Sequence, residues 1–195
     1  ILIGMRAEHG AIVGPKFEGS KWSFSVIGND IAKGICGSAL VQAVDEAVEA
    51  RLANADGEIL KPELLPFQPE LTLNQDDFRE FQLAKSAIRT GLDLVEKEAK
   101  SPARRLFLAG AFGEHLPLPA SRRMGLLPDL ETIAIGNASL LGIVDWMKAT
   151  TEKRDEFSRW LARSKTPIEL ALSDEFQTRF IDNLTLRPLS ETGAP

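Results

Sequence analysis

The sequence contains few of the residues that form disulfide frameworks or metal sites. Its 195 residues include a single cysteine, Cys36, and two histidines, His9 and His115. One thiol cannot form an internal disulfide or hold an iron–sulfur cluster, and this scarcity predicts a reducing, cytoplasmic location. The two histidines are far apart in sequence and lie in no H-x-x-x-H spacing, so neither predicts a zinc ligand. We expect no metal ligand within this sequence.

Long runs of one charge or of apolar residues are also missing. Lys and Arg total 23 against 28 Asp and Glu, a net charge of -5, and no basic block stands out. This balance argues against a nucleic-acid partner. No apolar run approaches the ~20 residues of a membrane span, and no signal peptide is recognisable. We therefore expect neither nucleic acid nor a membrane as a partner.

The common sequence motifs of catalysis and nucleotide binding are missing as well. The sequence has no G-x-S-x-G elbow and no Walker A motif. Leu108 stands where the G-x-G-x-x-G fingerprint would have its first glycine. The residues alone therefore predict no catalytic side chain and no dinucleotide-binding fingerprint.

What is present is the composition of a globular domain, with 44% hydrophobic and 26% charged residues. The length suits a single domain over residues 1–195. The chain opens on an apolar run that starts at Ile1 rather than at an initiator Met, so we expect a fragment of a longer protein. Alternating and helical patterns follow one another, which predicts an α/β fold with a mixed sheet flanked by helices.

The predicted elements follow the hydrophobic periods and the capping residues. Strands are expected within residues 1–30 and at 106–109, 132–135 and 168–172. Helices are expected after the turn at 34–38, from Asn74 to about residue 100, after Asn137, over residues 151–163 and after Ser173.

Apolar residues at helical spacing also predict which helix faces are buried. The long helix is expected to bury Phe78, Phe81, Ala84, Ile88, Leu92 and Val95 and to expose Glu80, Lys85, Arg89, Glu96 and Lys97. The two helices that follow Asn137 are expected to bury Leu140, Leu141, Val144 and Met147, and Phe157, Trp160 and Leu161.

One glycine turn follows the short apolar run 106–109. That run predicts a parallel strand buried on both faces. Gly110 and Gly113 then allow a sharp turn and a close backbone approach, because they carry no Cβ. A strand, a turn and a helix start in this order are where α/β folds bind ligands. The alternative is a turn that only reverses the chain.

A second glycine turn lies at residues 34–38. Gly34 and Gly37 bracket it, and Ser38 is predicted to cap the helix that follows. A helix start offers unpaired N–H groups to an anion or a ribose hydroxyl. The alternative is an ordinary helix cap, in which Cys36 is a small buried residue.

Six motifs, in this order, resemble those of one protein family. They are GMRAEHGAI at 4–12, GICGSAL at 34–40, LAKSAI at 83–88, LAGAFG at 108–113, MGLLP at 124–128 and IGNA at 135–138. Together they resemble the C-terminal part of the ATP-dependent reductive activators of corrinoid proteins, which are ferredoxin-like iron–sulfur proteins with an actin-like ATPase (ASKHA) domain. The match extends over nearly the whole chain, although Ala39 departs from the Gly-Ser-Gly of the family.

The resemblance implies a fold in which two ribonuclease-H-like lobes close on ATP. This chain would be mainly the second lobe, and both glycine turns would then contact one nucleotide. The nucleotide-binding residues that the resemblance implies are Gly34, Gly37, Ser38, Gly110, Ala111, Phe112 and Gly113. The first lobe, with the ligands for Mg²⁺ and the phosphates, would lie upstream.

The resemblance also implies the function of the parent protein. It would couple ATP to the one-electron reduction of cob(II)alamin on a corrinoid protein or methyltransferase, and a [2Fe–2S] cluster near its N-terminus would supply the electron. The cluster and half of the ATP site would be upstream, so we expect residues 1–195 alone to be inactive.

Two alternatives remain open from the sequence. One is a lobe of a sugar or acid kinase of the same superfamily. The other is a non-catalytic docking or dimerisation module, so a homodimer stays among the expected assemblies. A C-x₄-C-x₂-C run in the upstream sequence would exclude the kinase.

Overall fold

A mixed four-stranded sheet opens the chain in the computed structural model, which describes residues 1–163 and 169–187. Its strands are β1 (Gly4–Met5), β2 (Ala11–Glu18), β3 (Lys21–Val26) and β4 (Gly34–Cys36), in the order β1-β4-β2-β3. β2 and β3 form the expected antiparallel hairpin, and β4 pairs in parallel with β1 and β2. A 3-10 turn, η1 (Ile27–Asn29), follows β3 at the predicted glycine turn. The sheet is mixed, as predicted.

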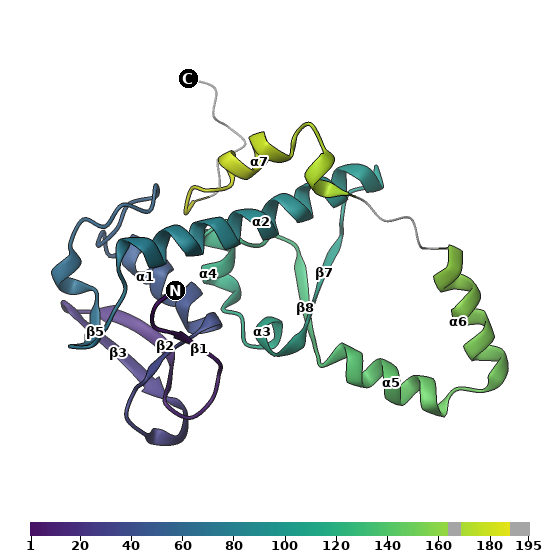
Figure 1. The fold of residues 1–195 in the computed structure, drawn as a ribbon, viewed down its shortest axis with the longest axis horizontal. Helices are drawn as coiled ribbons and strands as arrows, with labels where there is room; N and C mark the ends of the chain where they lie inside the picture. Colours follow the sequence, from purple (N-terminus) through teal and green to yellow (C-terminus); the bar gives the residue numbers. More distant parts are fainter. Residues whose placement is uncertain (164–168, 188–195) are drawn as a thin grey trace.

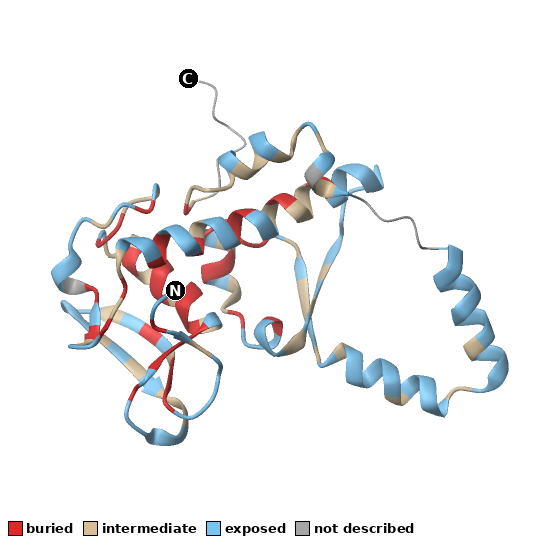
Figure 2. Ribbon diagram, viewed as in Figure 1, coloured by how far each residue is buried: buried red, intermediate tan, exposed pale blue. Residues whose placement is uncertain are grey.

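The core lies between this sheet and the helix α1 (Gly37–Glu49). α1 buries an apolar stripe that includes Leu40, Val41 and Val44, which is how an amphipathic helix packs on a sheet. The loop that follows contains the 3-10 turn η2 (Pro62–Leu64) and a small hairpin of β5 (Pro66–Gln68) and β6 (Leu71–Thr72). Phe67 of this hairpin packs 4.7 Å from the ring of Trp22 in β3. Figure 2 shows the buried residues gathered in this half of the molecule.

The long helix α2 (Gln75–Ala99) begins where the sequence predicts it. The Asn74 side chain accepts hydrogen bonds from the N–H groups of Asp76 and Asp77, at 2.9 and 3.0 Å, and the Asp77 carboxylate accepts one from the N–H of Asn74. This reciprocal capping box supplies partners for N–H groups that a helix start leaves unpaired.

The predicted buried face of α2 is only partly correct. Phe78 and Phe81 are buried, but Ile88 and Val95 are 46% and 47% exposed, and Lys85, expected to face water, is 2% exposed. The cause is the C-terminal segment 169–187, which lies along α2 (Figure 1). Its backbone carbonyls need hydrogen-bond donors, so the polar side chains of α2 face it and become buried.

Two parallel strands, β7 (Arg105–Ala109) and β8 (Glu131–Gly136), form a separate ladder. The short helices α3 (Gly110–Glu114) and α4 (Leu118–Arg123) lie between them in the chain. Burial of β7 on both faces is a wrong prediction, since Phe107 is 53% exposed and Leu106 and Leu108 are only half-buried. Burial on both faces needs a covering layer on each side, and the helix that follows β8, α5 (Ala138–Lys148), has no buried residue.

The next two helices have the expected positions but not the expected burial. α5 (Ala138–Lys148) is capped by the Asn137 side chain, and α6 (Thr151–Arg163) follows it. No residue of either helix is buried, which makes the predicted apolar core of both helices wrong. Figure 1 shows α5 and α6 running away from the rest of the molecule, so their apolar faces meet no layer of the fold. We call residues 138–163 the arm.

The predicted strand at 168–172 is also wrong where it can be compared. Ile168 lies outside the described residues, and η3 (Leu170–Leu172) is a 3-10 turn. Leu172 is largely exposed, and among the described residues none of the sheets includes this turn. The last helix, α7 (Phe176–Asp182), starts after Glu175, and Ser173 contributes its carbonyl rather than a side-chain cap.

Candidate functional site

The two glycine turns of the sequence meet in space. A Cβ atom on Gly37 would lie 3.1 Å from Cε2 of the Phe112 ring, so the ring is packed directly against this glycine. Gly37 starts α1 and Phe112 lies in α3, some 75 positions later in the chain. The two glycine turns, which are far apart in the sequence, are therefore in contact.

The first turn differs from the prediction in its cap. Cys36 is the N-cap residue of α1, with extended backbone angles, and Ser38 is already inside the helix. Ser38 instead places its Oγ 3.4 Å from the Sγ of the buried Cys36. Gly34 has a packing reason to be glycine, because a Cβ there would lie 2.5 Å from the carbonyl oxygen of Ile3. In this turn, Gly37 therefore lies next to Phe112, and Ser38 lies at the start of α1.

The second turn contains two glycines with different roles. Gly110 has a φ of +82°, which side chains disfavour, and a Cβ there would meet nothing within 4 Å. Gly113 is buried, and its Cβ would lie 3.1 Å from the Cβ of Leu108, so it is glycine for packing. Ala111 and Phe112 are exposed between them. Gly110 therefore combines a left-handed backbone with free space in front of it.

A cavity of about 140 Å³ lies where the two turns meet. Its lining is mainly apolar and comprises Ile1, Gly37, Leu40, Val41, Phe81, Ala84, Lys85, Ile88, Phe112 and Leu126. This explains the exposure of Ile88, because the apolar face of α2 forms a cavity wall there. Apolar cavities of roughly 150 Å³ accept a ring the size of benzene. The arrangement can therefore take an aromatic or apolar group, with the Phe112 ring as one wall.

Lys85 is the residue of this site that sequence reasoning missed. It lines the cavity, while its Nζ donates hydrogen bonds to the carbonyl oxygens of Asn183 at 2.8 Å and Thr185 at 2.6 Å. Burial lowers the pKa of Lys85 to about 8, Arg89 lowers it as well, and Asp93 opposes them. The partners lie some 100 residues away, so no local pattern could have indicated this role.

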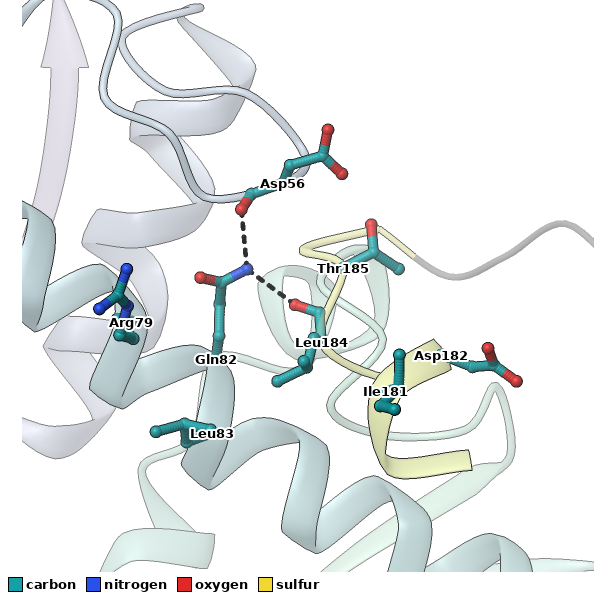
Figure 3. A pocket seen from close by; sticks show the side chains of 8 residues that line it. All are labelled: Asp56, Arg79, Gln82, Leu83, Ile181, Asp182, Leu184 and Thr185. Carbon is teal, nitrogen blue, oxygen red and sulfur yellow. Dashed lines mark hydrogen bonds between the residues drawn. The ribbon is translucent and has the colours of Figure 1, made fainter. Parts of the chain in front are cut away.

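A second hollow, of about 590 Å³, lies between α2, the loop before β5 and the C-terminal segment (Figure 3). Gln82 crosses it, and its Nε2 donates to the carbonyl oxygens of Asp56 and Leu184, both at 3.0 Å. This hollow shares no lining residue with the cavity beside Phe112. Its polar groups hold three chain segments together.

No set of metal ligands occurs in the part of the chain that the structure describes. There, no group of three or more His, Cys, Asp or Glu side chains could hold a metal ion. The cavity beside Phe112 is mainly apolar, and these described residues offer no carboxylate set for Mg²⁺. Among the helices of residues 1–163 and 169–187, none is both long and apolar enough to cross a membrane.

The mixed sheet, its covering helices and the paired glycine turns define an α/β domain of the ASKHA type. The sequence model of the family described as the C-terminal domain of RACo, the ASKHA domain, matches residues 1–192. The chain belongs to this family. The structure confirms the fold class that the six motifs indicate.

Two further proteins are similar to this chain. The corrinoid activation enzyme RamQ of Eubacterium limosum is 27% identical over 216 residues, which cover 94% of this chain and 36% of RamQ. A solved structure of a reductive activator for corrinoid, iron-sulfur protein has a TM-score of 0.79 and 23% identity, and the match covers 93% of this chain and 33% of that one. The chain thus spans about a third of the length of these proteins.

Proposed function

We propose that this chain is the C-terminal nucleotide-binding lobe of an activator that couples ATP to the reduction of cob(II)alamin on a corrinoid protein. The observation that carries the proposal is the meeting of Gly37 and Phe112 at an apolar cavity, in a chain of the RACo C-terminal family. Both similar proteins are activators of corrinoid systems by name, which supports the same role for the parent of this chain.

In this proposal the residues of this chain hold the nucleoside end of ATP. Phe112 supplies a ring face, and Gly37 and Gly110 leave the backbone free of side chains beside it. The upstream part of the parent would bind the phosphates, with Mg²⁺, and the [2Fe–2S] cluster. ATP would supply the binding energy, and the cluster, when bound there, would supply the one electron needed to reduce cob(II)alamin to cob(I)alamin.

Coupling follows from differential binding. A ligand shifts a protein between two states only by as much as it binds one state more tightly. ATP held between the lobes would favour the state that grips the corrinoid protein, and the corrinoid protein would in return raise the affinity for ATP. The lobe described here contributes its nucleoside contacts to that difference.

The test is Phe112→Ala in the full-length parent. Stacking of a base on an aromatic ring is worth about 1–3 kcal/mol, so we expect the affinity for MgATP in calorimetry to fall about tenfold. The melting temperature should stay the same, because Phe112 is 49% exposed. ATP-dependent corrinoid reduction should fall with the affinity, while a chemical donor should still reduce the cluster.

Phe107→Ala is the matched control for this experiment. Phe107 is a similarly exposed phenylalanine on the strand before the turn, and it does not line the cavity. Its replacement should leave ATP binding intact. Normal MgATP affinity in the Phe112 variant, or an equal loss in both variants, would contradict a nucleoside contact at Phe112.

A further inference from the structure

The arm exposes more large apolar side chains than a free surface normally would. Leu140, Leu141, Ile143, Trp146, Phe157 and Trp160 are each between 40% and 58% exposed. The rings of Trp146, Phe157 and Trp160 follow one another at centroid distances of 5.6 Å. Between α5 and α6 lies a groove of about 520 Å³ whose lining is mainly apolar but also includes Ser139, Asp145 and Lys153. Contiguous apolar patches of this kind mark interaction sites.

The ladder of β7 and β8, which leads into the arm, is exposed as well. β7 and β8 are parallel, and Phe107 and Ile135 stand exposed on them. Parallel strands occur almost only in sheets that are covered on both faces. The helix after such a strand normally packs back on the sheet, yet α5 buries none of its residues. The ladder and the arm therefore carry apolar side chains typical of a protein core, although these side chains are exposed.

The charge pattern of the arm indicates the chemistry of what covers it. α6 carries Glu152, Asp155 and Glu156 against Lys153, Arg154, Arg159 and Arg163, so it is close to neutral. Arg154 is also engaged, because it donates to the carbonyl oxygens of Trp146 and Met147 and thereby ties the two helices together. No excess of one charge is left to attract an oppositely charged partner. Permanent interfaces are more apolar than transient ones, so the occupant stays attached.

The length of this chain, compared with that of the similar proteins, indicates which permanent partner covers the arm. This chain is a C-terminal domain by family and covers only about a third of the proteins it resembles. Ile1 lines the same cavity as Phe112, which belongs to the helix directly after β7. A polypeptide that precedes Ile1 would thus emerge beside the bare ladder. A corrinoid protein that must bind and leave in each activation cycle would need a more polar surface.

We infer that the apolar face of the arm, with the groove between α5 and α6, is the docking site for an apolar surface of the polypeptide that precedes residue 1 in the parent protein. The inference rests on family membership and on exposure, and it holds whether or not Phe112 contacts a nucleotide. The arm then forms an intramolecular interface of the parent rather than the surface that binds the corrinoid protein.

Hydrogen exchange in the unmodified proteins gives the first test. Amides of residues 138–163 should exchange at least tenfold more slowly in the full-length parent than in the 195-residue chain. The protection should be the same at dilutions where the parent is a monomer and without a corrinoid protein. Equal exchange in both proteins would overturn the inference. Protection that appears only in a dimer, or only with the corrinoid protein, would also overturn it and would assign the arm to that partner instead.

Ile143→Glu gives the second test, because Ile143 lines the groove and is 58% exposed in this chain. The melting temperature of the 195-residue chain should not change, whereas that of the parent should fall by about 5 °C or more, as expected when a charge enters an interface. Ala162→Glu is the control, since it adds the same charge on the polar side of α6 beside Arg159 and Arg163. It should leave both proteins unchanged. An equal melting temperature of the parent with and without Ile143→Glu would contradict the docking site.

Discussion

Lys85 is 2% exposed in the middle of α2, and its ammonium group contacts backbone carbonyl oxygens rather than a carboxylate. A buried charge is costly unless hydrogen bonds satisfy it. Here the Lys85 ammonium group donates hydrogen bonds to two carbonyl oxygens of the C-terminal segment. The same side chain lines the cavity beside Phe112. One residue therefore belongs both to the candidate site and to the attachment of the chain end.

The pKa of Lys85 makes this role measurable. Its pKa is about 8 in the folded chain, against an ordinary value of 10.5, mainly because burial disfavours the charged form. Between these two pH values the unfolded chain binds more protons at this position than the folded chain. The free energy of unfolding therefore rises with pH across that window.

We predict that Lys85→Met removes this rise. The difference in unfolding free energy between the unmodified chain and the variant, measured with urea, should widen between about pH 8 and pH 10. Below that window the variant should already be less stable by about 1–3 kcal/mol, because the carbonyls of the half-buried Asn183 and Thr185 lose their donor. Lys61→Met, at an exposed position, is the control for the lost charge. Identical pH dependence in the Lys85 variant and the unmodified chain would show that Lys85 is not held as described.

At the scale of elements, Asp45 joins three of them. Its carboxylate is 1% exposed in α1, and it accepts hydrogen bonds from Arg123 at the end of α4 and from Arg187 in the C-terminal segment. Removal of a buried acceptor's charge weakens both hydrogen bonds, and bonds to charged groups are the stronger ones.

We expect Asp45→Asn to lower the free energy of unfolding by about 1–3 kcal/mol, because the amide keeps the shape but loses the charge. Glu49→Gln is the comparison, since Glu49 also pairs with Arg187 but at the surface. Surface pairs contribute little, so that variant should unfold like the unmodified chain in urea. Equal effects of the two substitutions would mean that burial does not distinguish these carboxylates.

Local patterns predict where the elements lie better than they predict what the elements face. Asn74 and Asn137 both cap helices at the expected places, because a cap depends only on a few adjacent residues. Burial depends on distant segments. Lys85 is buried by residues some 100 positions away, and Trp160, on the predicted buried face of α6, is 56% exposed. Apolar spacing marks a face that requires a partner, but not whether that partner belongs to the same chain.

In the candidate site too, the local sequence predicts where residues lie but not what they contact. Its glycines were recognisable in sequence because they bracket two short turns, yet their separate roles depend on three-dimensional neighbours. Gly34 is close to the Ile3 carbonyl and Gly113 to Leu108, whereas Gly110 has open space before it. Gly37 and Phe112 lie in helices that follow strands of two different sheets, and no spacing rule within either motif predicts that they meet.

At the scale of the whole molecule, the described residues form one wall of a proposed ATP site. They provide an apolar cavity of about 140 Å³ and a ring, and in their described part no cluster of carboxylates that could hold a metal ion. The phosphates and Mg²⁺ account for much of the charge-dependent binding energy of a nucleotide, because hydrogen bonds to charged groups are the strong ones. A wall that offers only nucleoside contacts should therefore bind weakly.

We predict that the 195-residue chain binds MgATP at least a hundredfold more weakly than the full-length parent in calorimetry. Adenosine should lose much less affinity than ATP between the two proteins, because its contacts would come from Phe112 and the neighbouring glycines. Phe112→Ala should abolish whatever adenosine binding the short chain retains. If the short chain binds MgATP with micromolar affinity, the phosphate ligands lie within these residues, and the division of the site between this chain and the upstream polypeptide is wrong.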